Sequence, residues 1–166
     1  MSLFLSCGEK HRRTRLPIAH NEERRYTYPG MTEKTHTVLL VEDEPAVSNV
    51  LRGALERAGY VVLAAGDGEE GLRLALLKHP DVILADLILP RMGGLEMIRS
   101  IRKDSWGAQA EVIILTNVSD VATLEEAMSQ DTFFYMIKGD SSMEDIVTKV
   151  GSRISAREPS EKKGSS

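Results

Sequence analysis

Short runs of apolar, mostly β-branched residues alternate along the chain with longer segments in which apolar residues recur every three or four positions. The runs predict five strands, at residues 38–41, 60–64, 82–85, 111–115 and 133–137. The periodic segments predict five helices, with apolar faces within residues 47–58, 72–76, 95–101, 121–128 and 143–154. Alternation of this kind is typical of a doubly wound parallel sheet with helices on both faces. We therefore predict an α/β fold with a five-stranded parallel sheet and five helices.

Residues that start and stop helices support this division of the chain. Pro45 stands where the first residue of a helix is expected, and Gly59 stands where that helix should end. Asp67 is placed to cap the second helix, which should end before Pro80. The pattern contains neither an internal repeat nor a second folded domain.

The two ends of the chain lack this regular pattern. Residues 1–35 have neither helical nor strand periodicity, and residues 157–166 are rich in Lys, Glu, Ser and Gly. We expect both segments to be disordered, with one folded domain at residues 36–156. Two alternatives remain for the first segment: it precedes a start at Met31, or it is a basic tail that touches nucleic acid or anionic lipid.

Charge and composition narrow the function. From Met31 to Ser155 twelve basic residues stand against twenty acidic ones, a net charge of −8, whereas residues 1–30 carry +3. An acidic domain disfavours direct binding to nucleic acid and suits divalent cations. No apolar run is long enough to span a membrane. The single cysteine, Cys7, allows no internal disulfide and fits a reducing, cytoplasmic compartment.

Chemically active side chains follow four of the five predicted strands. Glu42 and Asp43 come after the first strand, Asp86 after the third, Thr116 after the fourth and Lys138 after the fifth. The carboxyl ends of parallel strands lie at one edge of the sheet, where open α/β sheets bind their ligands. Pro90 and two glycines after Asp86 predict a loop there. We expect these five side chains to form one site.

The residue types make chemical sense together. Three neighbouring carboxylates repel one another unless a cation compensates their charge, and Mg²⁺ suits an open acidic site of this kind. Asp86 is then a candidate nucleophile that could carry a phosphoryl group, with Lys138 and Thr116 placed to bind phosphoryl oxygens. Taken singly, Lys138 could be a salt-bridge partner, Thr116 a helix cap and Glu42 a solvated acid.

Over residues 36–156 the chain resembles the receiver domains of two-component response regulators. The resemblance rests on four blocks: VLLVEDEP at residues 38–45, Asp86 with LPRMGG at 89–94, LT at 115–116, and YMIK at 135–138. It implies a flavodoxin-like sheet with strand order 2-1-3-4-5. It also implies that Asp86 is phosphorylated by a sensor histidine kinase or a phosphotransfer protein in the presence of Mg²⁺. Glu42 and Asp43 would form the acidic pair, and Asp43, Asp86 and the backbone carbonyl of Ile88 would be the protein ligands of the metal.

The resemblance also implies a switch. Thr116 would move toward the phosphoryl group, and Tyr135 matches an aromatic residue whose rotamer follows that movement. The altered surface would comprise the last two helices and the fifth strand. A downstream protein, or a second copy of the chain, would dock there.

The chain departs from the family pattern at several positions. Lys138 is followed by Gly139 instead of proline, so the bond between them should be trans and the aim of the lysine could differ. Asn117 stands where the family has a small residue, and its side chain could narrow access to the phosphoryl group. Residues 130–134 lack the usual Gly-Ala step and add aromatic bulk.

Three functions compete. We favour a stand-alone signalling domain that is not an enzyme, because only a short tail follows the fifth helix. An Asp-nucleophile phosphatase would need a second acid two residues after Asp86, and Ile88 stands there. A pseudo-receiver that never takes phosphate would act only as an interaction module. A nucleotide-binding domain is excluded because no glycine-rich loop follows the first strand.

One prediction concerns the lifetime of the phosphorylated form. In the family, the residues two positions beyond the phosphorylated aspartate and the threonine influence dephosphorylation, and here they are Ile88 and Val118. Neither side chain can orient an attacking water, so we predict a long-lived phosphoryl-aspartate that hydrolyses slowly. Loss of the phosphoryl group from the isolated domain measures this lifetime, and a half-life of seconds would contradict the prediction.

Overall fold

Five parallel strands form the centre of the protein. The computed structural model describes residues 35–117 and 134–157, and these segments belong to one compact unit. The strands are β1 (Thr37–Val41), β2 (Val61–Ala65), β3 (Val82–Asp86), β4 (Glu111–Thr116) and β5 (Phe134–Ile137). They pair in parallel in the order β2-β1-β3-β4-β5. The predicted α/β class and flavodoxin-like strand order are therefore confirmed.

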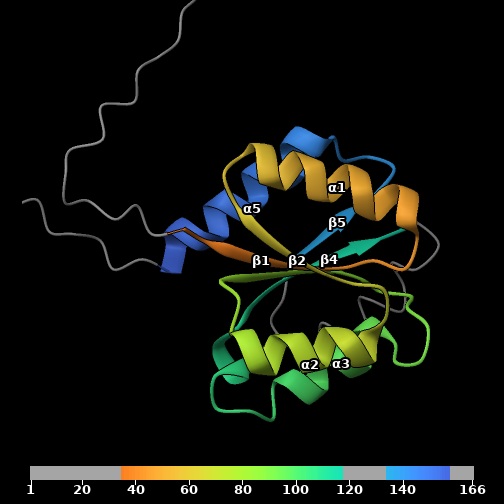
Figure 1. The fold of residues 1–166 in the computed structure, drawn as a ribbon, viewed down its shortest axis with the longest axis vertical. Coiled ribbons are helices and arrows are strands. Elements are labelled where there is room, and N and C mark those ends of the chain that lie inside the picture. Colours follow the sequence, from red (N-terminus) through yellow and green to blue (C-terminus); the bar gives the residue numbers. More distant parts are fainter. Residues whose placement is uncertain (1–34, 118–133, 158–166) are drawn as a thin grey trace, which may run out of the picture. The chain divides into compact units, whose positions relative to one another are not determined.

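Helices cover both faces of the sheet, α1 and α5 on one face and α2 and α3 on the other (Figure 1). The helices are α1 (Pro45–Arg57), α2 (Gly68–Lys78), α3 (Gly94–Ile101), α5 (Met143–Arg157) and the short 3-10 helix η1 (Gly107–Gln109). The further helix predicted around residues 121–128 lies outside the described residues. Within the described segments, no helix has the length and apolar character needed to cross a membrane.

The predicted helix ends are found in the structure. Pro45 is the first residue of α1. The carboxylate of Asp67 caps α2 and accepts a hydrogen bond of 2.9 Å from the backbone N–H of Glu70. His79 ends α2 in the left-handed conformation, with φ of 48°. These local signals divide the chain into elements before any tertiary packing is considered.

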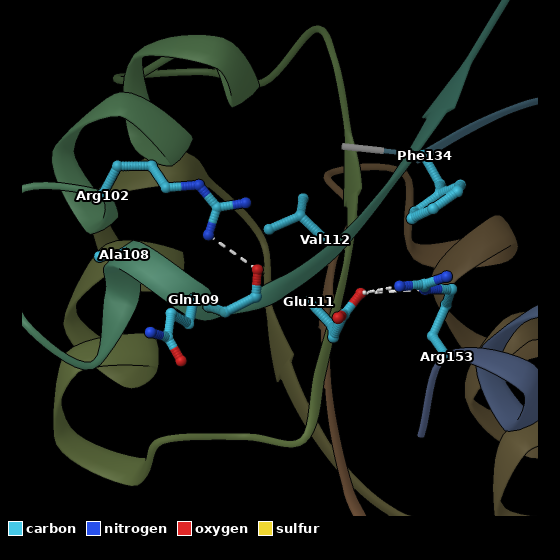
Figure 2. A pocket seen from close by; sticks show the side chains of 8 residues that line it. Arg102, Ala108, Gln109, Glu111, Val112, Phe134 and Arg153 are labelled. Carbon is cyan, nitrogen blue, oxygen red and sulfur yellow. Dashed lines mark hydrogen bonds and ion pairs between the residues drawn. The ribbon is translucent and has the colours of Figure 1, made fainter. Parts of the chain in front are cut away.

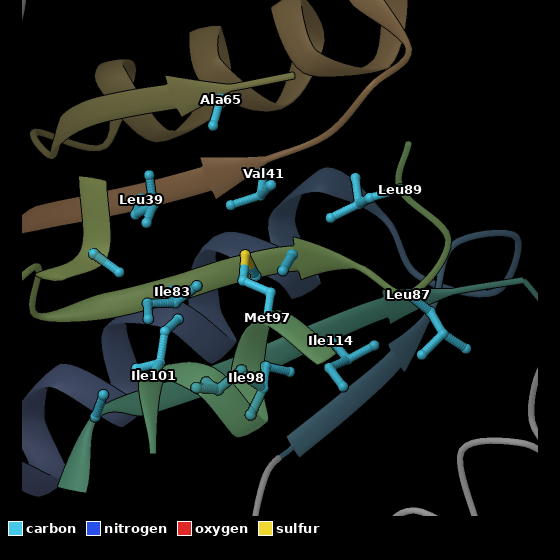
Figure 3. Close-up of a cluster of buried hydrophobic side chains, with 14 residues drawn as sticks. Leu39, Val41, Ala65, Ile83, Leu87, Leu89, Met97, Ile98, Ile101 and Ile114 are labelled. Carbon is cyan, nitrogen blue, oxygen red and sulfur yellow. The ribbon is translucent and has the colours of Figure 1, made fainter. Parts of the chain in front are cut away.

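The central strands are apolar on both sides because helices cover both sides. Successive residues of β1, β3 and β4 point alternately into two cores, one beneath α2 and α3 (Figure 3) and one beneath α1 and α5. The residues of these three strands in the first core are Leu39, Val41, Ile83, Ala85, Val112 and Ile114. Those in the second are Val38, Leu40, Val82, Leu84, Ile113 and Leu115.

Two features of the predicted pattern differ in detail. The edge strands β2 and β5 are less covered than the strands between them, because each has a paired neighbour on one side only. Val50 of α1 and Leu76 of α2, which belong to the predicted apolar faces, are 55% and 38% exposed. Each of these residues lies next to a more central position on its helix, Leu51 and Ala75, and that residue is buried.

A close contact at Gly94 fixes the start of α3 against the end of β3. The backbone N–H of Gly94 donates to the carbonyl of Leu87 at 2.9 Å. A Cβ atom at Gly94 would collide with the carbonyl oxygen of Asp86. This position therefore needs glycine for close approach between two backbones.

Replacing Gly94 with alanine should lower the free energy of unfolding by about 2 kcal/mol, because the added methyl group forces the two backbones apart. The matched control is Gly93→Ala at the preceding position. There φ is −65°, and a Cβ would meet nothing within 4 Å. That change should cost less than about 1 kcal/mol through weaker capping. Urea unfolding of both variants measures the difference, and equal losses would contradict the close-contact argument.

Candidate functional site

The carboxyl ends of four strands bring the predicted site residues to one edge of the sheet. Glu42 and Asp43 follow β1, and Lys138 follows β5. Asp86 and Thr116 are the last residues of β3 and β4, rather than the first residues of the following loops as the sequence predicted. The strands extend this far because Asp86 pairs with Leu115 in β4 and Thr116 pairs with Ile137 in β5.

Three carboxylates lie together at this edge. Glu42, Asp43 and Asp86 each offer a carboxylate oxygen, and these oxygens lie within 4.8 Å of one another. Glu42 is 3% exposed and Asp86 is 7% exposed, whereas Asp43 is exposed. A hollow of about 240 Å³ lies beside Glu42 and Asp43, between the end of β1 and the end of β2. The predicted acidic cluster is therefore present, and it is open on one side.

The ammonium group of Lys138 bridges two of these acids. Its Nζ atom donates to Glu42 Oε2 at 2.7 Å and to Asp86 Oδ2 at 2.6 Å. The backbone N–H of Lys138 donates to the carbonyl of Thr116 at 2.8 Å, which ties the base of the side chain to β4. Gly139 does not prevent this arrangement, and the described residues contain no cis peptide bond.

Backbone groups fix the remaining atoms of the site. The backbone N–H of Ile88 donates to Asp86 Oδ1 at 3.2 Å, and the N–H of Glu44 donates to Glu42 Oε1 at 3.3 Å. The buried hydroxyl of Thr116 donates to the carbonyl of Asn117 at 3.1 Å. Both oxygens of the Asp86 carboxylate thus have a donor.

The residues around this core lie at the surface. Asn117 is exposed, Ile88 is 62% exposed and Tyr135 is 38% exposed. Val118 and residues 130–133, on which the predictions about dephosphorylation and the family pattern rest, lie outside the described residues. The structure therefore places Ile88 and Tyr135 where a partner or solvent can reach them.

Burial and charge act in opposite directions on the two titratable groups of the bridge. Burial raises the pKa of Glu42; the Lys138 ammonium lowers it and the charge of Asp86 raises it, so the pKa stays above its ordinary value. Burial lowers the pKa of Lys138, but hydrogen bonds and charge from Asp86 and Glu42 outweigh burial and raise it. The lysine is therefore a fixed cation, and the ionised form of Glu42 is disfavoured.

The donor set fits a hard divalent cation. Three carboxylates face a single ammonium group among the contacts of the cluster, so two negative charges remain uncompensated when all three acids are ionised. Mg²⁺ takes one or two carboxylates and keeps several waters, which matches an exposed Asp43 beside a buried Asp86.

A second pocket lies at the opposite end of the sheet. It has a volume of about 340 Å³ and is lined by residues at the starts of β4 and β5, with Arg102 and Arg153 on either side (Figure 2). Arg102 donates to the carbonyls of Gly107 and Ala110, and Arg153 pairs with Glu111 at 2.9 Å. Both arginines thus bind groups of the protein itself: Arg102 binds carbonyls in and after η1, and Arg153 links α5 to the start of β4.

The structure contains one ion pair at this edge of the sheet that the sequence did not predict. Arg91, in the loop after β3, contacts Asp67, which the sequence identified only as a helix cap. The only sequence signal for this ion pair was the presence of opposite charges in two neighbouring loops. That signal is weak, because many oppositely charged residues in neighbouring loops form no contact.

Replacing Glu42 with glutamine should stabilise the metal-free domain at pH 7. Because the pKa of Glu42 is raised, the folded state holds its proton more tightly than the unfolded chain does. The free energy of unfolding therefore falls as pH rises from 4.5, the ordinary pKa of glutamate, through the raised pKa of Glu42. Above the raised pKa, this contribution to stability is absent. Glutamine keeps a carbonyl oxygen for Lys138 and removes this loss.

Urea unfolding in metal-free buffer at pH 7 and at pH 4 measures the effect. Glu42→Gln should gain stability at pH 7 and less at pH 4. The control is Glu44→Gln, which changes an exposed acid two residues away and should shift the free energy of unfolding by less than about 0.5 kcal/mol. A loss of stability in Glu42→Gln at pH 7 would contradict the stated balance of burial and charge.

Comparisons with known proteins identify the family of this chain. The probable transcriptional regulator ycf27 of Guillardia theta is 35% identical over 112 residues, which are 68% of this chain and 43% of that protein. A response regulator receiver domain protein from Clostridium thermocellum superposes with a TM-score of 0.66 at 28% identity, covering 73% of this chain and 95% of that one. The chain thus spans less than half the length of this curated relative and nearly all of this solved structure.

A second solved structure bears on the metal. The receiver domain of a sensor histidine kinase from Pseudomonas aeruginosa has a TM-score of 0.67 and 27% identity, over 73% of this chain and 98% of that one. Its crystal structure has a magnesium ion coordinated in the active site cleft. Residues 38–151 of the present chain match the family described as the response regulator receiver domain. With its fold and its acidic edge, the chain belongs to the response regulator receiver domains of two-component signalling systems.

Proposed function

We propose that this domain accepts a phosphoryl group on Asp86 from a sensor histidine kinase or a phosphotransfer protein. The observation that carries the proposal is the bridge at Lys138, whose ammonium lies within 2.7 Å of two buried carboxylates beside the exposed Asp43. A carboxylate held between a fixed cation and further acids, at an open strand edge, is suited to attack a phosphoryl group and then to carry it.

Each side chain has a part in the transfer. An oxygen of Asp86 attacks the phosphorus atom, and the bond from phosphorus to the donor histidine nitrogen breaks, which returns the electron pair to that nitrogen. The product is an acyl phosphate. Lys138, already in contact with Asp86 Oδ2, is placed to bind a phosphoryl oxygen, and the Thr116 hydroxyl can turn from the Asn117 carbonyl to another.

We propose that Asp43, Asp86 and the backbone carbonyl of Ile88 hold Mg²⁺, with Glu42 beside them. The metal, when bound, would neutralise charge on the transferring phosphoryl group. The excess of carboxylates over ammonium groups supports this assignment, because the acids repel one another without a cation. Asp43 is exposed and can exchange water for the metal without rearrangement of the core.

Phosphorylation would change the surface around β5 and α5, and a partner would recognise this change. Phosphorylation would draw Thr116 toward the phosphoryl group, and Tyr135, now 38% exposed, would follow. A downstream protein, or a second copy of the chain, would recognise the result. Several relatives are named transcriptional regulators. We propose that the present domain is cytoplasmic and acts by docking to a partner rather than by binding DNA. The reason is charge: residues 31–155 carry a net charge of −8, which opposes binding to nucleic acid.

The alternative functions are less well supported. A phosphatase would need a general acid at residue 88, and the aliphatic Ile88 cannot donate a proton. A pseudo-receiver needs no reactive set, whereas here the acids and the lysine are in direct contact. Slow loss of the phosphoryl group, as expected from Ile88, fits a signalling domain rather than an enzyme.

Incubation with acetyl phosphate and Mg²⁺, followed by intact mass spectrometry, tests the proposal. The protein should gain the mass of one phosphoryl group, because the Asp86 carboxylate displaces acetate. Asp86→Asn should gain nothing. Asp140→Asn makes the same change at an exposed acid two residues after Lys138 and should be phosphorylated like the parent protein.

The same experiment separates the competing functions. Absence of the adduct, with both acetyl phosphate and a cognate kinase, would favour the pseudo-receiver. Steady release of inorganic phosphate over many turnovers would favour the phosphatase. An adduct of equal size in Asp86→Asn would move the phosphorylation site elsewhere and overturn the assignment.

A further inference from the structure

We propose that the ion pair between Arg91 and Asp67 is a latch that positions the metal-binding loop after β3. This inference rests on the proposed function, because it concerns Mg²⁺ held by Asp43, Asp86 and the carbonyl of Ile88. Arg91 and Asp67 would not touch the metal or the phosphoryl group. They would act by holding the backbone of the loop in its binding conformation.

The ion pair joins two loops of the same sheet edge. Nη2 of Arg91, in the loop between β3 and α3, contacts Oδ2 of Asp67, in the loop between β2 and α2. The Arg91 side chain is 60% exposed, whereas the Asp67 side chain is only 6% exposed. The nearly buried carboxylate is also fixed from its other side, because its Oδ1 accepts from the N–H of Glu70 at 2.9 Å. Asp67 is thus a rigid anchor, and Arg91 is the group that it holds.

The backbone at Arg91 indicates that its conformation is imposed. Arg91 has φ of 64°, a left-handed conformation that residues with a side chain rarely adopt. The next residue, Met92, donates its N–H to the carbonyl of Pro90 at 2.7 Å, which makes the loop turn sharply. The Met92 carbonyl approaches Gly68 so closely that a Cβ there would collide with it. The loop is therefore pressed against the start of α2 at the point where the ion pair forms.

The latch lies next to the acidic cluster because of the strand order. β1 lies between β2 and β3, so a contact between the loops after β2 and β3 passes the end of β1, which Glu42 and Asp43 follow. The loop that carries Arg91 begins at Leu87, and its Ile88 N–H donates to Asp86 Oδ1. Movement of this loop would therefore shift both the Asp86 carboxylate and the Ile88 carbonyl.

Electrostatics alone predicts a different result from the latch. If Arg91 acted only through its charge, its removal would strengthen Mg²⁺ binding, because a nearby positive charge opposes a cation. Removal of the Asp67 charge would weaken binding. The latch predicts that both removals weaken binding, and that the two effects are not additive because both break the contact between Arg91 and Asp67. Arg91 also lies 3.9 Å from Glu69, but both of these side chains are 60% exposed, so this second contact contributes little.

Titration with MgCl₂, followed by amide chemical shifts, measures the dissociation constant in Arg91→Gln, Asp67→Asn and the double variant. Asparagine is as good a helix cap as aspartate, so Asp67→Asn keeps the cap of α2. Each single variant should raise the Mg²⁺ dissociation constant by about tenfold, the lower end of the effect of removing a group that orients a metal ligand. The double variant should be no weaker than the single ones.

The control is Arg73→Gln, which removes an arginine that is paired with Glu70 at 2.7 Å on the exposed side of α2. It should leave the Mg²⁺ dissociation constant unchanged. Hydrogen exchange in metal-free buffer gives a second readout: amides of residues 87–93 should exchange faster in Arg91→Gln, while those of β1 and β4 keep the protection of the parent protein.

Unchanged or tighter Mg²⁺ binding in Arg91→Gln would overturn the latch, as would additive effects in the double variant. In that case the parent protein still binds Mg²⁺ and still takes a phosphoryl group from acetyl phosphate, so the proposed function stands. A parent protein that neither binds Mg²⁺ nor gains a phosphoryl group would instead overturn the proposed function, and the latch with it.

Discussion

The contact of one ammonium group with two buried carboxylates is the interaction on which the rest of the site depends. Lys138 lies between Glu42 and Asp86, and without it two acids would lie side by side in a poorly solvated place. Burial would then act on Glu42 without the opposing charge of the ammonium group, and the pKa of Glu42 would rise further. The lysine therefore holds Asp86, the proposed phosphate acceptor, in place and balances part of the charge of the two acids. The third acid, Asp43, leaves an excess of negative charge that a divalent cation can remove.

The fold brings the three side chains of this contact together. Glu42 and Lys138 are 96 positions apart in the chain, and they meet because the ends of parallel strands share one edge. The apolar runs of β1, β3 and β4 are held from both faces, which fixes the strand ends to which the acids belong. Gly94 lets the start of α3 approach the backbone of Asp86, so the strand end is held from the loop side too. The backbone contacts that hold the fold together therefore also position the residues of the proposed site.

Much of this arrangement could be predicted from the sequence, for identifiable reasons. Local patterns can be recognised directly from the sequence. They predicted the apolar strands, the start of α1 at Pro45 and the helix cap at Asp67. The set of edge residues followed from the parallel topology. The pairing of Lys138 with Glu42 could not be predicted from the sequence. The strand order places three acids at similar distances from the lysine, and only side-chain geometry determines which of them it contacts. The exposure of Val50 and the contact of Arg91 with Asp67 depend equally on packing that periodicity does not encode.

We propose that Asp86, and not another acid of the cluster, carries the phosphoryl group. Sodium borohydride reduces an acyl phosphate to an alcohol, so a phosphorylated aspartate becomes homoserine and can be located by peptide sequencing. After treatment with acetyl phosphate and Mg²⁺, we predict homoserine at position 86, with Asp43 and Glu42 unchanged. Homoserine at position 43, or no reduced residue in a protein that has gained phosphoryl mass, would contradict it.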